Sequence, residues 1–361
     1  MTFKDDWDET KQRFEGWWKG EAIGRPLMHV VGRKERPGEP LEDLPPKQKE
    51  FDAGRIVADF KNYFKSHVFL DAAFPSVSAD LGPGSMALYL GCEPEFMNDT
   101  VWFKECAQNG WDAYGPLVYD GNNRWWVKHL EMIAEVRELA GRDFLINIPD
   151  IMENLDILAS MRGALNLCYD LIDDAEAIHG MLGKMESLYY KYYDAMYGVV
   201  KGEDGSSSYT AFRIWGPGKT VKLQCDYSSV MSPGQFAEFA APYIERIARG
   251  MDRSLYHLDG EDAVKHLDAV LKIGAIDAVQ WEPGDFNPDA GDERWYGIYD
   301  KVRSSGKGLW LAFRDGRPDD WLERADKIVK RYGAAGLYFI FPVMPEKTAD
   351  GLLAGAEKLW G

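Results

Sequence analysis

Cysteine is scarce in this chain, and the few cysteines form no recognisable pair. Cys92, Cys106, Cys168 and Cys225 are widely separated in the sequence, and no CxxC motif occurs. A disulfide framework and a zinc ribbon both require a characteristic cysteine spacing, so neither is expected. The composition therefore predicts that most of these cysteines are reduced residues of the core, and that Cys168 and Cys225 are not nucleophiles.

Long apolar segments and an excess of positive charge are also missing. No apolar run approaches the about 18 residues of a membrane-spanning helix, and the acidic start MTFKDDWDETKQRF lacks the basic and apolar parts of a secretion signal. The chain has 42 Lys and Arg against 59 Asp and Glu, a net charge of −17. Nucleic acids and anionic membranes are bound through an excess of basic residues. We therefore expect a cytoplasmic protein with a small-molecule substrate and neither of those partners.

Strand and helix patterns alternate along the whole chain of 361 residues, a length that can bury one large core. Eight strand positions are predicted, at residues 26–32, 68–73, 144–148, 209–227, 254–258, 276–281, 309–313 and 337–341. They predict an α/β fold, a single (βα)8 barrel domain over residues 1–361, with a doubly wound open sheet as the alternative. We expect an N-terminal helix at residues 5–19 outside the barrel, and elaborated loops from residues 74–124 over its mouth.

The chemistry is predicted to lie in residues 254–284, which form one strand, helix, strand unit. His257 and Asp259 come at the end of its first strand, and Trp281 and Glu282 at the end of its second. Ligands of α/β barrels and open α/β sheets bind at the carboxyl ends of the strands. A structural His257, a helix-capping Asp259 and a surface Glu282 are the alternatives that the residues alone leave open.

Several segments resemble one known superfamily. The run CDYSSVMSPGQFAEFAAPYIERI at residues 225–247, followed by YHLDG at 256–260, is similar to motifs of the uroporphyrinogen decarboxylase and cobalamin-dependent methyltransferase superfamily. There, an acidic residue precedes an SP-containing helix, and the next strand ends in HxCG. The opening FEGWWKGEAIGRPLMHV and the closing PVMPEKTADGLLAGAE also resemble that superfamily. The resemblance implies a uroporphyrinogen decarboxylase-like barrel, and HLDG is similar to a divergent group with a trimethylamine corrinoid-type label.

The chain departs from the superfamily at its metal-binding positions. In the methyltransferases, zinc is held by the His and Cys of HxC and by a distant second Cys, and it activates a thiol. Here Asp259 stands at the Cys position beside His257, and the closing LYFIFPVMP has no cysteine. A site without thiolate ligands donates less electron density to a bound thiol, so thiol methylation is not expected. The RQAGR signature of the decarboxylases is replaced by HVVGRKE, which argues against a porphyrin substrate.

The predicted site combines carboxylates, a histidine and aromatic side chains. The residues expected to be catalytic are His257, Asp259, Asp226 and Glu282. Those expected to bind the substrate are Trp281, Trp215, Tyr256 and His29. An indole at a strand end can stack on the flat face of a sugar or a corrinoid. If zinc is bound, His257 and Asp259 are its expected ligands, with a further carboxylate as the third.

Three function classes stay open on this sequence. The first is corrinoid-linked methyl transfer or demethylation of a small substrate, with the corrinoid carried by a partner protein. The second is a hydrolase or lyase of a glycoside-like ring, or a decarboxylase, in which carboxylates act directly as acid and base. The third is a binding protein without catalysis on the same fold. The superfamily resemblance favours the first class.

Overall fold

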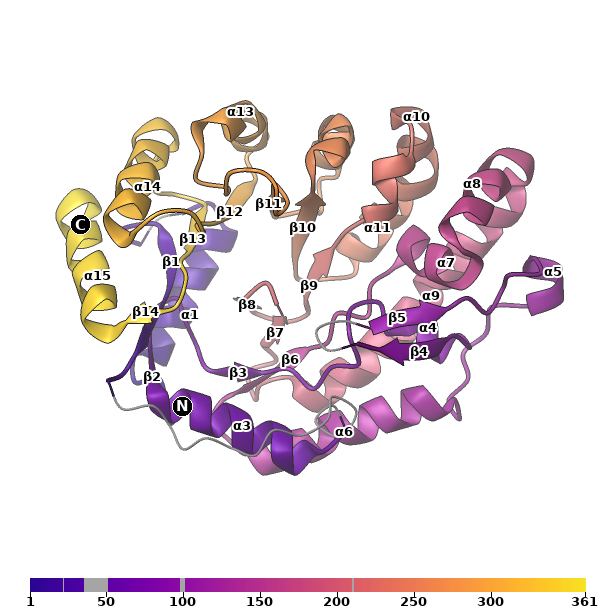
Figure 1. Cartoon of the computed structure of the whole chain (residues 1–361), viewed down its shortest axis with the longest axis horizontal. Coiled ribbons are helices and arrows are strands. Elements are labelled where there is room, and N and C mark those ends of the chain that lie inside the picture. The colour runs from indigo at the N-terminus through magenta and orange to yellow at the C-terminus, as the bar shows by residue number, and fades with distance from the viewer. Residues whose placement is uncertain (22, 36–50, 98–100, 210) are drawn as a thin grey trace.

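The fold is α/β and rests on strands that are mostly parallel (Figure 1). This computed structural model describes residues 1–361 except 22, 36–50, 98–100 and 210. The largest sheet has the order β14 (Met344–Pro345), β1 (Leu27–Arg33), β13 (Leu337–Ile340), β12 (Gly308–Ala312), β11 (Ala278–Glu282), β10 (Arg253–Asp259) and β9 (Thr220–Leu223). These neighbours are parallel, and β2 (His67–Asp71) adds an antiparallel strand to β1.

Two smaller sheets complete the described strands. The first has the order β3 (Ser76–Val77), β6 (Leu145–Ile148), β7 (Ser207–Tyr209) and β8 (Ile214–Gly216), in which β8 returns antiparallel to β7. The second is the antiparallel hairpin of β4 (Glu93–Phe96) and β5 (Val101–Lys104). The predicted strand at 209–227 is therefore three short strands with a reversal between the first two.

The expected eight-stranded barrel is not closed within the described residues. One edge of β1 pairs with β13 at residues 27–29 and with β14 at residues 32–33, and its other edge is taken by the antiparallel β2. The free edge of β7 is taken by the antiparallel β8. A strand has only two edges, so β1 cannot also pair with β3, nor β7 with β9. At the second of these places Ser207 bridges the gap. Its hydroxyl accepts from Thr220 N at 3.1 Å and donates to Gly218 O at 2.7 Å.

The helices lie around the outside of the strands (Figure 1). The longer ones are α1 (Trp7–Trp18), α3 (Ala53–Ser66), α6 (Arg124–Ala140), α7 (Asn154–Arg162), α8 (Ala164–Asp173), α9 (Ala175–Val200), α11 (Ala241–Arg249), α12 (Leu267–Lys272), α13 (Tyr296–Ser304), α14 (Pro318–Tyr332) and α15 (Glu346–Trp360). The short helices are α4 (Met86–Tyr89), α5 (Trp111–Tyr114) and α10 (Pro233–Gln235). Of the described helices, none combines the length and apolar character needed to cross a membrane.

Helix α1 covers the amino ends of the strands. Trp17 Nε1 donates to the carbonyl of Gly336, just before β13, at 3.1 Å, and Trp18 Nε1 donates to the carbonyl of Trp215 at 2.8 Å. Phe14 on the same face is fully buried. The aromatic side chains of α1 thus close one end of the core, which leaves the opposite, carboxyl edge of the strands for a site.

One face of the large sheet carries polar side chains where it meets the β7–β8 loop. Strand register places His257, Gln280 and Trp310 in one row on β10, β11 and β12. Trp310 Nε1 donates to the carbonyl of Phe212 in that loop at 2.8 Å, and the Phe212 ring lies 5.2 Å from the His257 ring. In Figure 1 the β7–β8 hairpin lies inside the ring formed by the other strands. We call this side of β9 to β13 the inner face.

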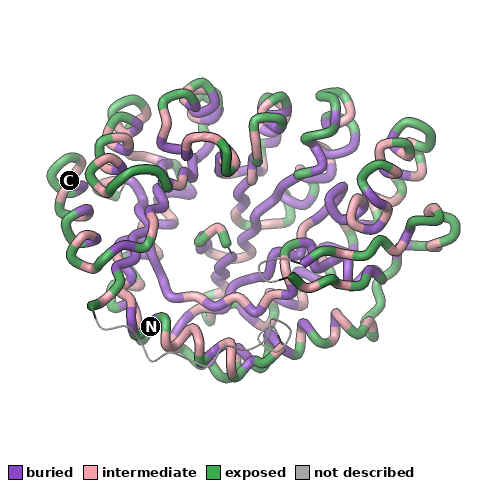
Figure 2. Tube along the Cα trace, in the orientation of Figure 1, coloured by how far each residue is buried: buried purple, intermediate pink, exposed green. Residues whose placement is uncertain are grey.

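Burial follows the same layers (Figure 2). The strands are mostly buried along their length, whereas the outer helices alternate between buried and exposed turns, as amphipathic helices do. The described residues between 74 and 123 include β3, α4, the paired strands β4 and β5, and α5. Gly84 N and Met86 N donate to the carbonyls of Asp150 and Ile151, just beyond β6. This part of the region therefore lies at the carboxyl edge of the strands.

Candidate functional site

Three of the predicted residues come together at the carboxyl edge of β9 and β10. His257 and Asp259 are two residues apart on β10, so both point to the inner face. Asp226 begins the 3₁₀ turn Asp226–Val230 after β9. One potential ligand atom from each residue lies within 4.8 Å of those from the other two. Both aspartates are exposed and His257 is half-buried, so the cluster is open to solvent.

A glutamine on the neighbouring strand orients the imidazole of His257. Gln280 on β11 is in register with His257, and its Oε1 lies within hydrogen-bonding distance of His257 Nδ1. An amide oxygen only accepts, so Nδ1 carries the proton and Nε2 keeps its lone pair. Burial, together with the positive charge of Lys222, lowers the pKa of His257. The ring is therefore neutral near pH 7 and offers one nitrogen to a metal ion or a proton.

Asp226 is held in place by Gln224 and Asp156. Gln224 Nε2 donates to Asp226 Oδ2 at 2.7 Å and to Asp156 Oδ2 at 3.1 Å. Asp156 Oδ2 also accepts from the backbone N of Asp226 at 3.0 Å. Although Asp226 as a residue reaches solvent, protein atoms surround most of its carboxylate, and this loss of water, with the negative charges of Asp259 and Asp150, raises the pKa of Asp226 to about 6. Burial and the charge of Asp226 raise the pKa of Asp156 to about 6 as well.

Behind the cluster lies a buried cation in an acidic interior. The Lys222 side chain is completely buried, forms an ion pair with Asp150 Oδ2 at 2.8 Å and donates to Gln224 Oε1. Glu153 accepts from the backbone N of Gln224 at 2.8 Å, while its second oxygen finds no partner within the described residues. Burial raises the pKa of Glu153 to about 8. Lys222 thus offsets carboxylates that would otherwise be buried without compensation.

Glu282 lies beside the cluster in register but turns to a different partner. It is opposite Asp259 on β11, yet its Oε1 lies 3.0 Å from Arg314 Nη1 and accepts from Gly284 N at 3.2 Å. Glu282 therefore does not join the three potential ligands, because its carboxylate forms an ion pair with Arg314 instead. Arg314 follows β12, so this ion pair also lies at the carboxyl edge.

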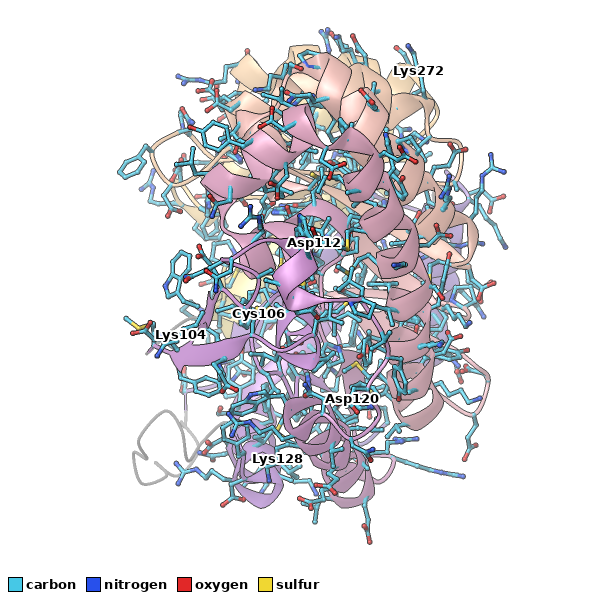
Figure 3. All side chains as sticks on the ribbon, turned by 90° about the vertical axis from the view of Figure 1, so that its right-hand side faces the viewer. Lys104, Cys106, Asp112, Asp120, Lys128 and Lys272 are labelled. Carbon is cyan, nitrogen blue, oxygen red and sulfur yellow. The ribbon has the colours of Figure 1, made fainter. Side chains whose placement is uncertain are left out.

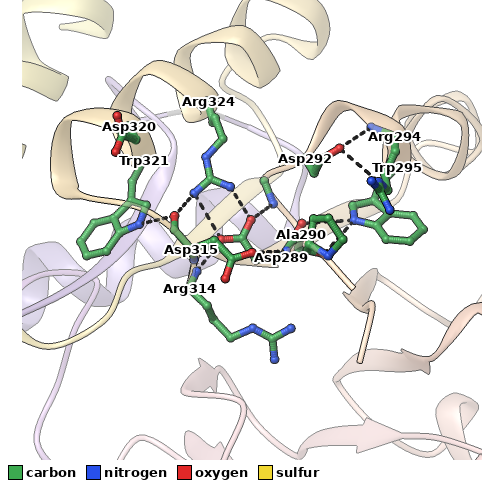
Figure 4. Close-up of polar contacts among 12 residues, drawn as sticks. Asp289, Ala290, Asp292, Arg294, Trp295, Arg314, Asp315, Asp320, Trp321 and Arg324 are labelled. Carbon is green, nitrogen blue, oxygen red and sulfur yellow. Dashed lines mark hydrogen bonds and ion pairs between the residues drawn. The ribbon is translucent and has the colours of Figure 1, made fainter. Parts of the chain in front are cut away.

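A buried aspartate fixes the loop that carries Arg314 (Figure 4). Asp289 Oδ2 accepts from the backbone N of Arg314 at 2.6 Å and of Asp315 at 2.7 Å. Arg324 approaches both of its oxygens, at 2.5 and 3.2 Å. The Asp289 side chain is completely buried. A charge held by several donors makes this loop rigid, so Arg314 is presented to Glu282 from a fixed backbone.

The aromatic residues predicted to bind the substrate do not flank the cluster. Trp281 is fully buried, and its ring packs 5.1 Å from that of Trp295. Side chains alternate along a strand, so Trp281 faces away from Gln280 and Glu282, and Tyr256 likewise faces away from His257. The structure therefore does not bring Trp281 and Tyr256, both predicted to bind the substrate, beside the three potential ligands, because the sequence located the strand ends but not the direction of these side chains.

Trp215 was also predicted to bind the substrate, and the structure places it at the amino end of the core. It belongs to β8, which runs antiparallel to β7, and its ring lies 5.7 Å from that of Trp7 and 6.2 Å from that of Phe14. The unforeseen strand reversal moved it to the far end of the core. Its indole therefore packs against α1 rather than near Asp226.

His29 lies on β1, between Ile340 of β13 and Asp71 of β2. It is buried, and within the part of the chain that the structure describes its Nδ1 has no hydrogen-bond partner. Burial and the charge of Arg213 hold its pKa well below the usual histidine value. It is thus a neutral imidazole of the interior, on a strand remote in sheet order from β10.

The supporting residues around the cluster were not predicted. Lys222 and Gln224 stand in the run VKLQCD, and Gln280 stands in AVQWE, where buried strands otherwise carry apolar side chains. A buried polar residue must find a partner, so polar residues inside apolar strands were the available signal. Asp150, Glu153 and Asp156 follow β6, and nothing in their spacing connects them with β9.

The three potential ligands fit a divalent cation that prefers nitrogen and oxygen. Zn²⁺ takes His nitrogen and Asp oxygen at about 2.0 to 2.2 Å, and catalytic sites combine three protein ligands with one open position. His257, Asp226 and Asp259 supply that number, and both aspartates are exposed to solvent. Gln280 supplies the partner that metal-bound histidines normally have on their other nitrogen.

Comparison with solved structures shows which folds this chain shares. It resembles a methyltransferase from Methanosarcina mazei with a TM-score of 0.65 and 12% identity, over 98% of this chain and 99% of that one. It also resembles a B12-independent methionine synthase from Shewanella sp. W3-18-1, solved in complex with selenomethionine, with a TM-score of 0.50 and 10% identity, over 92% and 97% of the two chains. The chain has the fold of these methyltransferases. At the level of sequence, no protein-family model and no curated protein matches it.

Proposed function

We propose that this protein is a methyl-transferring enzyme whose site holds a divalent cation, most simply Zn²⁺, with Asp226, His257 and Asp259. The observation that carries the proposal is the convergence of these three side chains at the carboxyl edge of the strands. The shared fold with two methyltransferase structures supports the reaction class. Fold alone does not fix chemistry, so the argument depends on the donor set.

The donor set defines the kind of group that the site would bind. A cation held here would act as a Lewis acid on a substrate oxygen or nitrogen. Two carboxylates and an imidazole form a hard ligand set, which favours oxygen and nitrogen over sulfur as the remaining ligand. We therefore propose a small methylated substrate, not a thiol acceptor, with a corrinoid on a partner protein as the methyl carrier.

The surrounding residues have positioning roles in this proposal. Gln280 fixes the tautomer of His257, and Gln224 holds Asp226 through a 2.7 Å hydrogen bond. Lys222 balances the buried carboxylates behind the cluster without itself reaching the solvent. A site with fixed ligands loses little free energy to reorganisation when a cation and a substrate bind.

The test combines metal analysis with an activity assay. The purified chain should bind about one divalent cation per molecule, and His257→Ala and Asp259→Asn should each lower that affinity strongly. Asp262→Asn, at an exposed carboxylate three residues from Asp259, is the matched control and should bind like the wild type. Methyl transfer from a panel of methylated amines and ethers to a reduced corrinoid protein is then followed by the absorbance of the corrinoid. Metal-free protein with full methyl-transfer activity would contradict the proposal.

A second candidate function is the cleavage of a glycosidic bond by the two carboxylates themselves. The favouring observation is that Asp226, with a pKa of about 6, stands beside Asp259 at an exposed edge. Their potential ligand oxygens are within 4.8 Å, closer than the roughly 6.5 to 9.5 Å between the carboxyl groups of inverting enzymes. Of the two mechanisms, this short spacing favours the retaining one. Hydrolysis of aryl glycosides by the chain alone, in the presence of a chelator, would favour it over methyl transfer.

A further inference from the structure

Two cysteines that are distant in sequence are in direct contact at the base of the β4–β5 hairpin. Cys92 directly precedes β4, and Cys106 follows β5 by two residues. Cys92 Sγ donates to Cys106 Sγ across 3.3 Å. A disulfide bond is about 2.05 Å long. Small rotations of the two side chains would therefore bring these sulfurs within bonding distance.

The backbone on both sides of this pair is fixed. Glu93 and Lys104 are paired in the hairpin register, and Ala107 N donates to the carbonyl of Met161 at 2.8 Å. The pair lies against the end of α7, where Cys92 Sγ contacts the Ser160 carbonyl at 3.7 Å. The two sulfurs are thus held together by secondary structure rather than by a chance rotamer.

The two thiols differ in access to solvent. Cys92 is completely buried, whereas Cys106 is partly exposed, on the side of the molecule that faces the viewer in Figure 3. The hydrogen bond from Cys92 lowers the pKa of Cys106. This is the usual division between an accessible reacting thiol and an adjacent resolving thiol. Cys168, by comparison, accepts a hydrogen bond from Tyr227 OH at 2.9 Å, and its partner is a phenol rather than a thiol.

We propose that Cys92 and Cys106 form a redox modification site that closes to an intramolecular disulfide on exposure to a hydroperoxide. The Cys106 thiolate attacks one peroxide oxygen, the O–O bond breaks, and Cys106 becomes a sulfenic acid as the peroxide is reduced to water or an alcohol. The Cys92 thiol then attacks the sulfenic sulfur, the S–O bond breaks, and water leaves with the proton of Cys92. Two thiols are oxidised for each peroxide reduced.

The experiment counts thiols in the full chain before and after treatment with hydrogen peroxide. Alkylation under denaturing conditions should show a fall from four free thiols to two. Lys104 lies between the two cysteines, so trypsin should release two separate peptides that stay joined only without reductant. Cys106 should be the first thiol to react, ahead of Cys168 and Cys225.

Single substitutions separate the two steps. Cys92→Ser should halt the reaction at the sulfenic acid of Cys106, which dimedone captures, and Cys106→Ser should abolish the rapid loss of thiols. Cys168→Ser is the control, because it leaves the pair intact and should still form the joined peptides. The proposal is overturned if four thiols survive in the wild type, or if Cys168 or Cys225 reacts before Cys106. Linkage between two molecules instead of within one would overturn it as well.

Discussion

Replacement of Lys222 by methionine tests whether a buried cation holds the acidic interior behind the site together. Methionine keeps the length and apolar contacts of the stem but removes the ammonium group. In the wild type that group forms an ion pair with Asp150 at 2.8 Å, donates to Gln224 and lies 5.3 Å from the Phe212 ring. The side chain is completely buried, so water cannot replace these contacts.

The expected loss of stability is large. Removal of one partner from a buried ion pair costs about 3 to 5 kcal/mol, because the other charge stays buried without compensation. Most proteins have a total unfolding free energy of only about 5 to 15 kcal/mol. With a denaturant slope of about 3 kcal/mol per M in urea, Lys222→Met should lower the midpoint by about 1 to 2 M.

Two further variants make the result interpretable. Lys219→Met removes a lysine only three residues away, whose 2.7 Å ion pair with Asp194 is exposed, and should cost at most about 1 kcal/mol. Asp150→Asn in the Lys222→Met background removes the stranded charge and should restore at least about 1 kcal/mol. If Lys222→Met is no more destabilising than Lys219→Met in urea denaturation at pH 7, the electrostatic account of the interior is wrong.

Three other predictions follow from the buried groups around the site. Burial raises the pKa of Glu153 from 4.5 to about 8, so the stability that its protonated form contributes is present below about pH 4.5 and lost as the pH rises toward 8. Glu153→Gln should remove this loss, and urea midpoints between pH 5 and pH 9 that fall equally in both proteins would contradict it. Gln280→Leu should lower the affinity of the His257 site for Zn²⁺ by about 10- to 100-fold in a competition titration, and an unchanged affinity would argue against a role for the amide. Asp289→Ala should cost about 3 to 5 kcal/mol in urea denaturation, since it removes the ion pair of Arg324 and the acceptor of several backbone N–H groups; a cost below about 1 kcal/mol would refute this.

Part of the candidate site could be predicted because it depends on local sequence. The pattern of residues 254–284 predicted a strand that ends near His257 and Asp259, and β10 ends at Asp259. Two residues separate them, so the alternation of a strand puts both on one face whatever the rest of the fold does. Asp226 was predicted from the superfamily resemblance, and the structure places it within reach of both.

The sequence by itself determined the alternation of helices and strands, the net negative charge and the strand end that carries His257 and Asp259, because each depends on composition or on neighbours along the chain. Tertiary structure decided which strands pair with each other, and hence that β2 pairs with β1 and β8 with β7 where the expected barrel would have continued. It also decided that Trp281 faces away from the site and that Gln280 and Lys222 support it. These features depend on strand pairing and on hydrogen bonds between residues far apart in the chain, and periodicity in one segment carries no information about a partner in another.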